Sequence, residues 1–227
     1  MRVERSPALI ITADDYGYHP SYDEEILEAA GAGAVDAVGA MVLRPGIDPE
    51  ALLRTGVEIG LHLELPPGGP SDRAAGVAAL RDQLGRFEEL FERPAAYLGG
   101  HHHCHARGAA AAALAAEAAA RGLPVRSVDA AHRAMLRRVA AMTPDRLVGR
   151  TSEEAEAALP AVLRPVVEDG GELPTGVTEW MVHPGHPDSA SGSDYDLARE
   201  EDLDLLLSLS LEPTLSAARL GHLAALA

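Results

Sequence analysis

The sequence contains a single cysteine, Cys104, among 227 residues. One thiol cannot form an intrachain disulfide, so the fold does not depend on an oxidising compartment. The chain also lacks a run of about 20 apolar residues, the length that a membrane-spanning helix requires. The early apolar run from Ala8 to Ile11 is too short for the core of a secretory signal, and acidic residues follow it at once. We therefore expect a cytoplasmic protein that does not enter a membrane.

Basic residues are also scarce, since 19 lysines and arginines stand against 35 acidic residues and give a formal net charge of -16. A field of this sign repels phosphate backbones and anionic lipid surfaces. We expect neither a nucleic acid nor a membrane as partner. The charge suits a neutral or cationic small molecule.

Composition is otherwise that of a globular protein, with 47% hydrophobic and 24% charged residues. The sequence shows no internal repeat and no low-complexity linker. A chain of this length can bury one core of ordinary size. We therefore predict a single domain over residues 1–227.

Short apolar runs alternate with amphipathic segments along the whole chain, which predicts an α/β fold with a largely parallel sheet. The expected strands cover residues 8–13, 34–42, 57–65, 95–100, 124–128 and 176–185. Helices are expected after Ser21, over 76–93, over 107–122, over 151–171 and in the tail. Two of them begin with a capping box, formed by Ser21 with Glu24 and by Thr151 with Glu154.

Polar side chains stand where the expected strands end. Asp14 and Asp15 follow the first strand, His62 lies in the third, and His183 ends the last, four residues after Glu179. Each has an ordinary structural interpretation, because aspartates are common in turns and lone histidines are often satisfied inside a core. Parallel sheets, however, gather the carboxyl ends of their strands at one rim, where functional groups of such folds lie.

Two imidazoles and a carboxylate on one rim would form a metal site with open positions for water and substrate. Nitrogen and oxygen donors of this kind suit zinc, iron, manganese or cobalt. A bound divalent ion acidifies water and polarises a carbonyl, and a spare carboxylate can take the proton. Asp14 and Asp15 are adjacent and can divide these two tasks.

The segment LGGHHHCH places His101, His102, His103 and His105 directly after the fourth expected strand. The cluster stands in mid-chain, which argues against an affinity tag. His101 and His105 would share a face if the run opened an α-helix. Four imidazoles cannot all bind one ion, so some of them have other roles. Cys104, with no second cysteine, is interpreted as a small apolar residue.

These motifs together resemble the YdjC-like carbohydrate deacetylases, also called the ChbG family. ITADDYG resembles the family's opening NADDFG, GLHLEL its third-strand histidine motif, and LGGHHHCH its DxHHHxH run. PVRSV resembles the family's short strand that carries an arginine, and TEWMVHPG its late segment that ends in HP. The likeness covers nearly the whole chain, in order and in spacing.

The resemblance implies a distorted (β/α) barrel related to the polysaccharide (NodB-like) deacetylases, with one divalent ion, Mg²⁺ or Zn²⁺. It implies Asp15, His62 and His101 as the metal ligands. Asp14 would be the general base, and His183 an acid or a partner of the oxyanion. Residues assigned to substrate are Arg126, His105 and Glu179. The implied reaction is hydrolysis of an N-acetyl group from an amino sugar or a short chitooligosaccharide, and a homodimer is plausible.

The sequence departs from the family pattern at Gly99, where the family carries an aspartate before the histidine run. The segment between GLH and that run is also short. Two alternatives follow from these departures. One is a metallohydrolase of another amide or ester, and the other is a relative that binds a metal or sugar without turnover.

Overall fold

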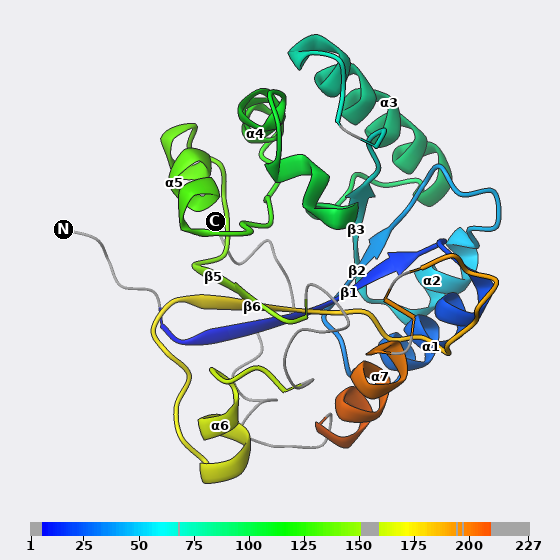
Figure 1. The fold of residues 1–227 in the computed structure, drawn as a ribbon, viewed down its shortest axis with the longest axis vertical. Helices are drawn as coiled ribbons and strands as arrows, with labels where there is room; N and C mark the ends of the chain where they lie inside the picture. The colour runs from blue at the N-terminus through cyan, green and yellow to red at the C-terminus, as the bar shows by residue number, and fades with distance from the viewer. Residues whose placement is uncertain (1–5, 68, 151–158, 194, 197, 210–227) are drawn as a thin grey trace.

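A computed structural model describes residues 6–67, 69–150, 159–193, 195–196 and 198–209 (Figure 1). Six parallel strands form one sheet in the order β4-β3-β2-β1-β6-β5. The strands are β1 (Ala8–Tyr16), β2 (Ala37–Ala40), β3 (Glu58–Leu63), β4 (Leu98–Gly100), β5 (Arg146–Val148) and β6 (Val177–Val182). The sheet curls into a half-barrel, and the predicted α/β fold of distorted barrel type is confirmed.

Helices flank the sheet on its outer side (Figure 1). They are α1 (Pro20–Gly31), α2 (Pro49–Thr55), α3 (Arg73–Phe91), α4 (Ala111–Ala120), α5 (Ala130–Arg138), α6 (Arg164–Asp169), α7 (Ala198–Leu209) and the 3₁₀ helix η1 (His101–Ala106). Helices α3, α4 and α5 contact one another in succession, and α1 contacts both α2 and α7. In the part of the chain that the structure describes, no helix is long and apolar enough to cross a membrane.

The sheet is the centre of the core, and β1 is its most enclosed strand. All nine residues of β1 are buried, since β2 and β6 pair with its two edges. Helix α3 covers the sheet with an apolar stripe at helical spacing. The buried members of this stripe are Leu80, Leu84, Phe87 and Phe91. Such two-sided burial explains why the strands are almost continuous apolar runs in the sequence.

Two local predictions are wrong. Residues 124–128 do not form a strand, since only Val125 makes an isolated bridge, to Leu98 of β4. The segment bonds on its other side to irregular chain, where the Val125 N–H donates to the Met142 carbonyl. Helix α1 begins at Pro20 rather than after Ser21, and the side chain of His19 caps it. Proline suits the first helical position because it has no N–H there to leave unpaired.

Other differences concern elements that the sequence did not reveal. Helices α2 and α5 and strand β5 were not predicted, because each is short and none carries a long periodic pattern. The capping residues Thr151 and Glu154 lie outside the described residues. Within the expected helix over 151–171, the described helical part is α6.

A glycine in β3 is required by close packing. A Cβ at Gly60 would overlap the ring of Tyr97, which is fully buried. We expect Gly60→Ala to lower the free energy of unfolding by about 1–3 kcal/mol through overpacking. The matched control is Gly85→Ala, on the exposed face of α3, where a Cβ meets nothing within 4 Å. That control should raise stability by about 0.4–1 kcal/mol, and chemical denaturation of both variants checks the pair. Equal effects of the two changes would contradict the packing argument.

Candidate metal centre

Asp14 and Asp15 lie where β1 departs from regular geometry. The pairing of β1 with β2 shifts register between Ala13 and Tyr16, and Asp15 has a left-handed backbone with φ of 72°. A bulge of this kind re-aims side chains at the end of a strand. As a result, both neighbouring carboxylates line the same cleft, although each is almost completely buried.

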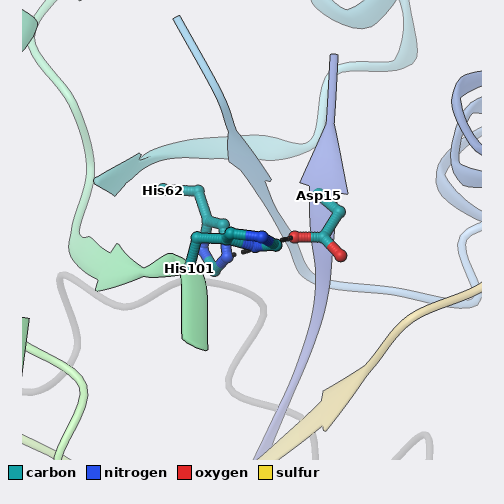
Figure 2. Close-up of side chains that lie close together, drawn as sticks. All are labelled: Asp15, His62 and His101. Carbon is teal, nitrogen blue, oxygen red and sulfur yellow. Dashed lines mark hydrogen bonds and ion pairs between the residues drawn. The ribbon is translucent and has the colours of Figure 1, made fainter. Parts of the chain in front are cut away.

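Three side chains from different elements converge beside this bulge (Figure 2). Asp15 comes from β1, His62 from β3, and His101 from the start of η1. The Oδ1 atom of Asp15 lies 3.0 Å from Nδ1 of His101 and 3.3 Å from Nε2 of His62. One ligand atom of each residue lies within 4.8 Å of the others, so the three form a group that could hold a metal ion.

These separations fit a single coordinated ion. Ligand atoms about 2.1 Å from an ion lie about 3.0 Å apart in octahedral geometry and about 3.4 Å apart in tetrahedral geometry. The two distances from Asp15 Oδ1, to His101 Nδ1 and to His62 Nε2, both fall in this interval. Two neutral imidazole nitrogens and one carboxylate oxygen also match the donor types of catalytic zinc sites, which keep a position open for water.

The second carboxylate oxygen of Asp15 is held by Arg199, a residue of α7. Its Nη2 lies 2.6 Å from Asp15 Oδ2, and its guanidinium lies over the ring of Tyr22, 3.9 Å from the ring centre. This pairing leaves Oδ1 directed at the two histidines. Burial raises the pKa of Asp15, but the hydrogen bonds from His101 and His62 and the charge of Arg199 hold it well below its usual value.

Asp14 is fixed by a second buried arginine, Arg126. Arg126 Nη1 donates to Asp14 Oδ2 and Nη2 to Oδ1, while Nε donates to Glu179 Oε1 at 2.7 Å. Thr12 joins this network through its hydroxyl. Burial raises the pKa of Asp14, but the charges of Arg126 and His62 outweigh this effect and lower the pKa to about 2. The Asp14 carboxylate is therefore ionised at every physiological pH.

His183 faces Asp14 across the cleft. Its Nε2 lies 4.0 Å from Asp14 Oδ2, and its ring packs 4.7 Å from the ring of Tyr195. The backbone N–H of His183 donates to Asp202, which fixes the end of β6. Burial lowers the pKa of His183 to about 4, despite the nearby carboxylates, so its imidazole is neutral near pH 7.

The histidine run turns sharply instead of forming an α-helix. His102 and His103 both have left-handed backbones, with φ of 49° and 57°. His101 and His105 therefore do not share a helical face: His101 meets Asp15, while Nε2 of His105 lies 3.0 Å from the carbonyl of Arg126. Cys104 is half-buried and donates to the Leu63 carbonyl, in keeping with its predicted structural role.

The structure divides the predicted site residues into two groups. Five of them line a cleft of about 400 Å³, namely Asp14, Asp15, His62, His101 and His183. Those assigned to substrate, Arg126, His105 and Glu179, are fully buried, and among the described residues they are not part of the cleft lining. Their contact with substrate stays a prediction. In the structure they form hydrogen bonds with Asp14, with Thr12 and with one another.

The structure shows what an aspartate in place of Gly99 would contact. A Cβ at this position would lie 3.4 Å from His62 Nδ1 and 3.5 Å from Arg126 Nη1. His62 Nδ1 is buried and has no hydrogen-bond partner among the described residues, since Asp14 Oδ1 is 3.6 Å away. An acidic side chain at residue 99 would thus lie beside the unpaired His62 Nδ1 and the guanidinium of Arg126. Among the described residues, Arg126 forms its ion pairs with Asp14 and Glu179.

Sequence reasoning missed Arg199 and Tyr195 as residues of the site. Both line the cleft, and both come from the segment after β6. Neither belongs to a short motif of recognisable spacing. For Arg199 the sequence offered only the residue type: a buried arginine needs a carboxylate partner, and Asp15 is such a partner.

Replacing one histidine of the run tests the metal site. We expect His101→Ala to weaken Zn²⁺ binding by more than the roughly 10–100-fold that follows loss of an outer-shell partner, because a direct ligand is removed. His102→Ala is the matched control, since His102 is exposed and lies outside the ion-binding group. Isothermal titration with Zn²⁺ measures both affinities. An equal loss in the two variants would place the ion elsewhere in the run.

Removing the cation beside Asp14 tests the electrostatics. In Arg126→Met we expect the Asp14 pKa to rise from about 2 to above 3.8, since burial then acts with less opposition. In the native protein the lowered pKa of Asp14 stabilises the fold above about pH 4, and this stabilisation is lost as the pH falls through about 2. Arg126→Met should lack this stabilisation. NMR titration of the Asp14 carboxyl carbon measures the shift.

Stability provides the control for this variant. Breaking a buried pair costs about 3–5 kcal/mol, whereas Arg81→Met removes an exposed partner of Glu117 and should destabilise the fold far less. An Asp14 pKa that stays near 2 in Arg126→Met would show that Arg126 does not control it.

Comparison with known proteins places the chain in a family. The model of the YdjC-like proteins matches residues 8–217. A chitooligosaccharide deacetylase of Serratia marcescens is 29% identical, and the match covers 92% of this chain and 93% of that protein. A chitooligosaccharide deacetylase of Escherichia fergusonii is 27% identical, with 90% and 92% covered.

Two further similarities are partial or structural. A carbohydrate deacetylase of Mus musculus is 34% identical over 43% of this chain, and the match spans only 42% of the mouse protein. The crystal structure of an Enterococcus faecalis protein has the same fold, with a TM-score of 0.75, 21% identity, and coverage of 98% of this chain and 99% of that one. The family match extends from β1 beyond α7 and includes every residue of the metal centre, so the chain belongs to the YdjC-like protein family.

Proposed function

We propose that the protein is a metal-dependent hydrolase that removes an N-acetyl group from an amino sugar or a short chitooligosaccharide. One observation carries this proposal: an ion-binding group, an ionised carboxylate and a neutral imidazole line one cleft. Amide hydrolysis needs an activated water, a polarised carbonyl and a proton for the leaving amine. The ion and the carboxylate could supply the first two, and the imidazole could pass the proton of the water on to the amine. The names of the Serratia and Escherichia relatives supply the class of substrate.

Asp15, His62 and His101 would hold one divalent ion, Zn²⁺ or Mg²⁺. Two imidazole ligands favour Zn²⁺ over Mg²⁺, which prefers oxygen donors. When bound, such an ion lowers the pKa of a water molecule and polarises the acetyl carbonyl. Arg199 supports this arrangement, because it occupies Oδ2 of Asp15 and leaves Oδ1 for the ion.

Asp14 and His183 carry the protons in the proposed reaction. Asp14 takes a proton from the attacking water, whose oxygen bonds to the acetyl carbon. His183 is neutral at rest and lies 4.0 Å from Asp14 Oδ2, so it would first receive this proton from Asp14 through a bridging water and then, as an imidazolium, deliver it to the leaving nitrogen. The C–N bond then breaks, and acetate and the free amino sugar are the products. Arg126 keeps Asp14 ionised and oriented between these steps.

The net charge of -16 fits the proposed product, because deacetylation creates a cationic amine. The proposed partner is therefore a small carbohydrate. A homodimer and a cytoplasmic location stay predictions.

Acetate release from N-acetylglucosamine oligomers is the direct test. We expect release that a chelator abolishes and Zn²⁺ or Mg²⁺ restores. Asp14→Asn should slow it by about 10²–10⁴-fold, the usual contribution of a general base, while metal affinity is retained. The matched control is Asp82→Asn, on the exposed face of α3, which should keep full activity.

The other outcomes separate the alternatives. Release from simple esters or other amides, with none from acetylated sugars, would indicate a metallohydrolase of a different substrate. Sugar binding without release, with any ion, would indicate a non-catalytic relative. Undiminished release from Asp14→Asn would show that the assigned base is wrong.

A further inference from the structure

Tyr22 is a fully buried residue of α1 that no step of the proposed reaction uses. Its ring contacts Arg199 of α7, whose guanidinium carbon lies 3.9 Å from the ring centre. Helices α1 and α7 lie side by side, so this contact joins two helices from opposite ends of the described chain (Figure 1). Tyr22 is therefore one contact away from Asp15, which Arg199 holds.

The guanidinium of Arg199 makes few hydrogen bonds in its own plane. Nη2 donates to Asp15 Oδ2, whereas Nε and Nη1 are buried and have no hydrogen-bond partner among the described residues. Arg126 is different, since its Nε, Nη1 and Nη2 all donate to neighbouring side chains. A single hydrogen bond fixes the position of one nitrogen but not the tilt of the whole plane. The orientation of Arg199 therefore needs a second restraint.

The face of the Tyr22 ring supplies this restraint. A guanidinium within about 6 Å of an aromatic ring centre is attracted to the negative face of the ring, and more strongly where water is excluded. Tyr22 and Arg199 are both buried, with 0% and 1% of their surfaces exposed. The ring thus favours the orientation of Arg199 in which Nη2 meets Oδ2 of Asp15, and Oδ1 stays directed at the two histidines.

The hydroxyl of Tyr22 contacts a different part of the site. It donates to Asp196 Oδ1 at 2.5 Å and lies 2.6 Å from Ser191 Oγ. Ser191 Oγ in turn accepts from the N–H of Ser193, and Ser193 Oγ accepts from the N–H of Tyr195. Ser193 and Tyr195 line the cleft of the metal centre. The hydroxyl therefore holds a segment of the cleft wall, while the ring faces Arg199.

The backbone after β6 passes directly against the stacked pair of Tyr22 and Arg199. A Cβ at Gly185 would lie 2.7 Å from Cδ1 of Tyr22 and 3.1 Å from Cδ of Arg199. The first of these distances is shorter than a Cβ contact allows, so a side chain at residue 185 would push the ring aside. The close fit shows that the ring is held in place from this side as well.

We propose that Tyr22 is a positioning residue of the metal centre, whose ring orients Arg199 on Asp15 and whose hydroxyl fixes the cleft wall. This inference rests on the metal-dependent function proposed above and deepens it, because it assigns part of the ion affinity to a residue outside the ion-binding group. Among the described residues, Tyr22 is not part of the cleft lining. Two parts of one side chain then act separately on ion binding and on the wall.

Titration of the metal-free protein with Zn²⁺ tests the role of the ring. We expect Tyr22→Leu to weaken Zn²⁺ binding by roughly 10–100-fold, as the loss of other outer-shell partners does. Tyr22→Phe keeps the ring and should keep the native affinity. The matched control is Phe87→Leu, because Phe87 is a fully buried ring of α3 outside the cleft. It should lower stability without changing Zn²⁺ affinity.

A second variant leaves Tyr22 in place and covers the case in which Tyr22→Leu does not fold. Gly185→Ala displaces the ring and should also weaken Zn²⁺ binding. Gly31→Ala, at the exposed end of α1 where a Cβ meets nothing within 4 Å, should not. Circular dichroism establishes which variants are folded. Native Zn²⁺ affinity in a folded Tyr22→Leu or Gly185→Ala would overturn the role of the ring, and so would an equal loss in Tyr22→Phe or Phe87→Leu.

The native protein also allows a test without any substitution. Protons above the face of an aromatic ring resonate upfield because of the ring current. In the metal-free native protein we expect upfield NMR signals for the guanidinium protons of Arg199, and native positions of these signals in Tyr22→Phe. Guanidinium signals without this shift would show that the two groups are not stacked in solution and would overturn the proposal.

Tyr22→Phe separates the hydroxyl from the ring. With saturating Zn²⁺ it should raise KM for N-acetylglucosamine oligomers roughly three- to tenfold, the range of one hydrogen bond, and leave kcat unchanged. It should also speed amide hydrogen exchange at Ser193 and Tyr195, a measurement that requires no turnover. Native exchange rates together with a native KM would overturn the role of the hydroxyl.

Zn²⁺ titration distinguishes this proposal from the deacetylase proposal, since ion binding can be measured without turnover. Native protein that binds Zn²⁺ without releasing acetate, and that loses affinity in Tyr22→Leu, would support the positioning role and refute the deacetylase. Acetate release combined with native Zn²⁺ affinity in Tyr22→Leu would do the reverse. Native protein that binds no Zn²⁺ would overturn both.

Discussion

The guanidinium of Arg126 lies fully buried between Asp14 and Glu179, and the rest of the site depends on this arrangement. The barrel interior contains three carboxylates close together, those of Asp14, Asp15 and Glu179. Without cations they could not all remain ionised, because isolated buried charges are strongly disfavoured. Arg126 forms ion pairs with Asp14 and Glu179, and Arg199 forms one with Asp15. The two arginines thus allow neighbouring aspartates to remain charged for different tasks.

Counting these formal charges explains why the site suits a divalent ion. Three carboxylates and two guanidiniums leave one net negative charge in the buried network. A divalent cation would convert this to one net positive charge. In the proposed reaction, that sign would favour a transition state in which an acetyl oxygen becomes an oxyanion. The network would therefore suit both the ion and the proposed chemistry.

Much of the site could be predicted from the sequence because parallel strands end at one rim. Asp15, His62 and His101 are far apart along the chain, yet each follows or ends an apolar run, and the sheet brings them together. The fold class follows from the same alternation. Arg199 could not be found this way, since it comes from a helix whose pattern does not specify which carboxylate it meets. Residues 124–128 were predicted wrongly because the segment meets β4 only at Leu98, and the sequence does not show that the pairing stops after one bridge.

The histidine run shows how one short segment serves several parts of the site. His101 turns toward Asp15, Cys104 bonds to β3, and His105 supports the backbone of Arg126. The left-handed residues His102 and His103 make these divergent directions possible. The segment therefore joins the candidate metal centre, through His101, to the network that holds Asp14, through His105.

The position of Arg199 on α7 has a consequence for the stability of the molecule. Helix α7 packs against α1 and sends this arginine onto the ring of Tyr22 and the free oxygen of Asp15. An ion at the candidate metal centre would need Asp15 in the orientation that this contact fixes. By thermodynamic linkage, ion binding would then favour the docked state of α7, and loosening of α7 would weaken ion binding by the same free energy. Helix α7 would thus act on ion affinity indirectly, through Arg199 and Asp15.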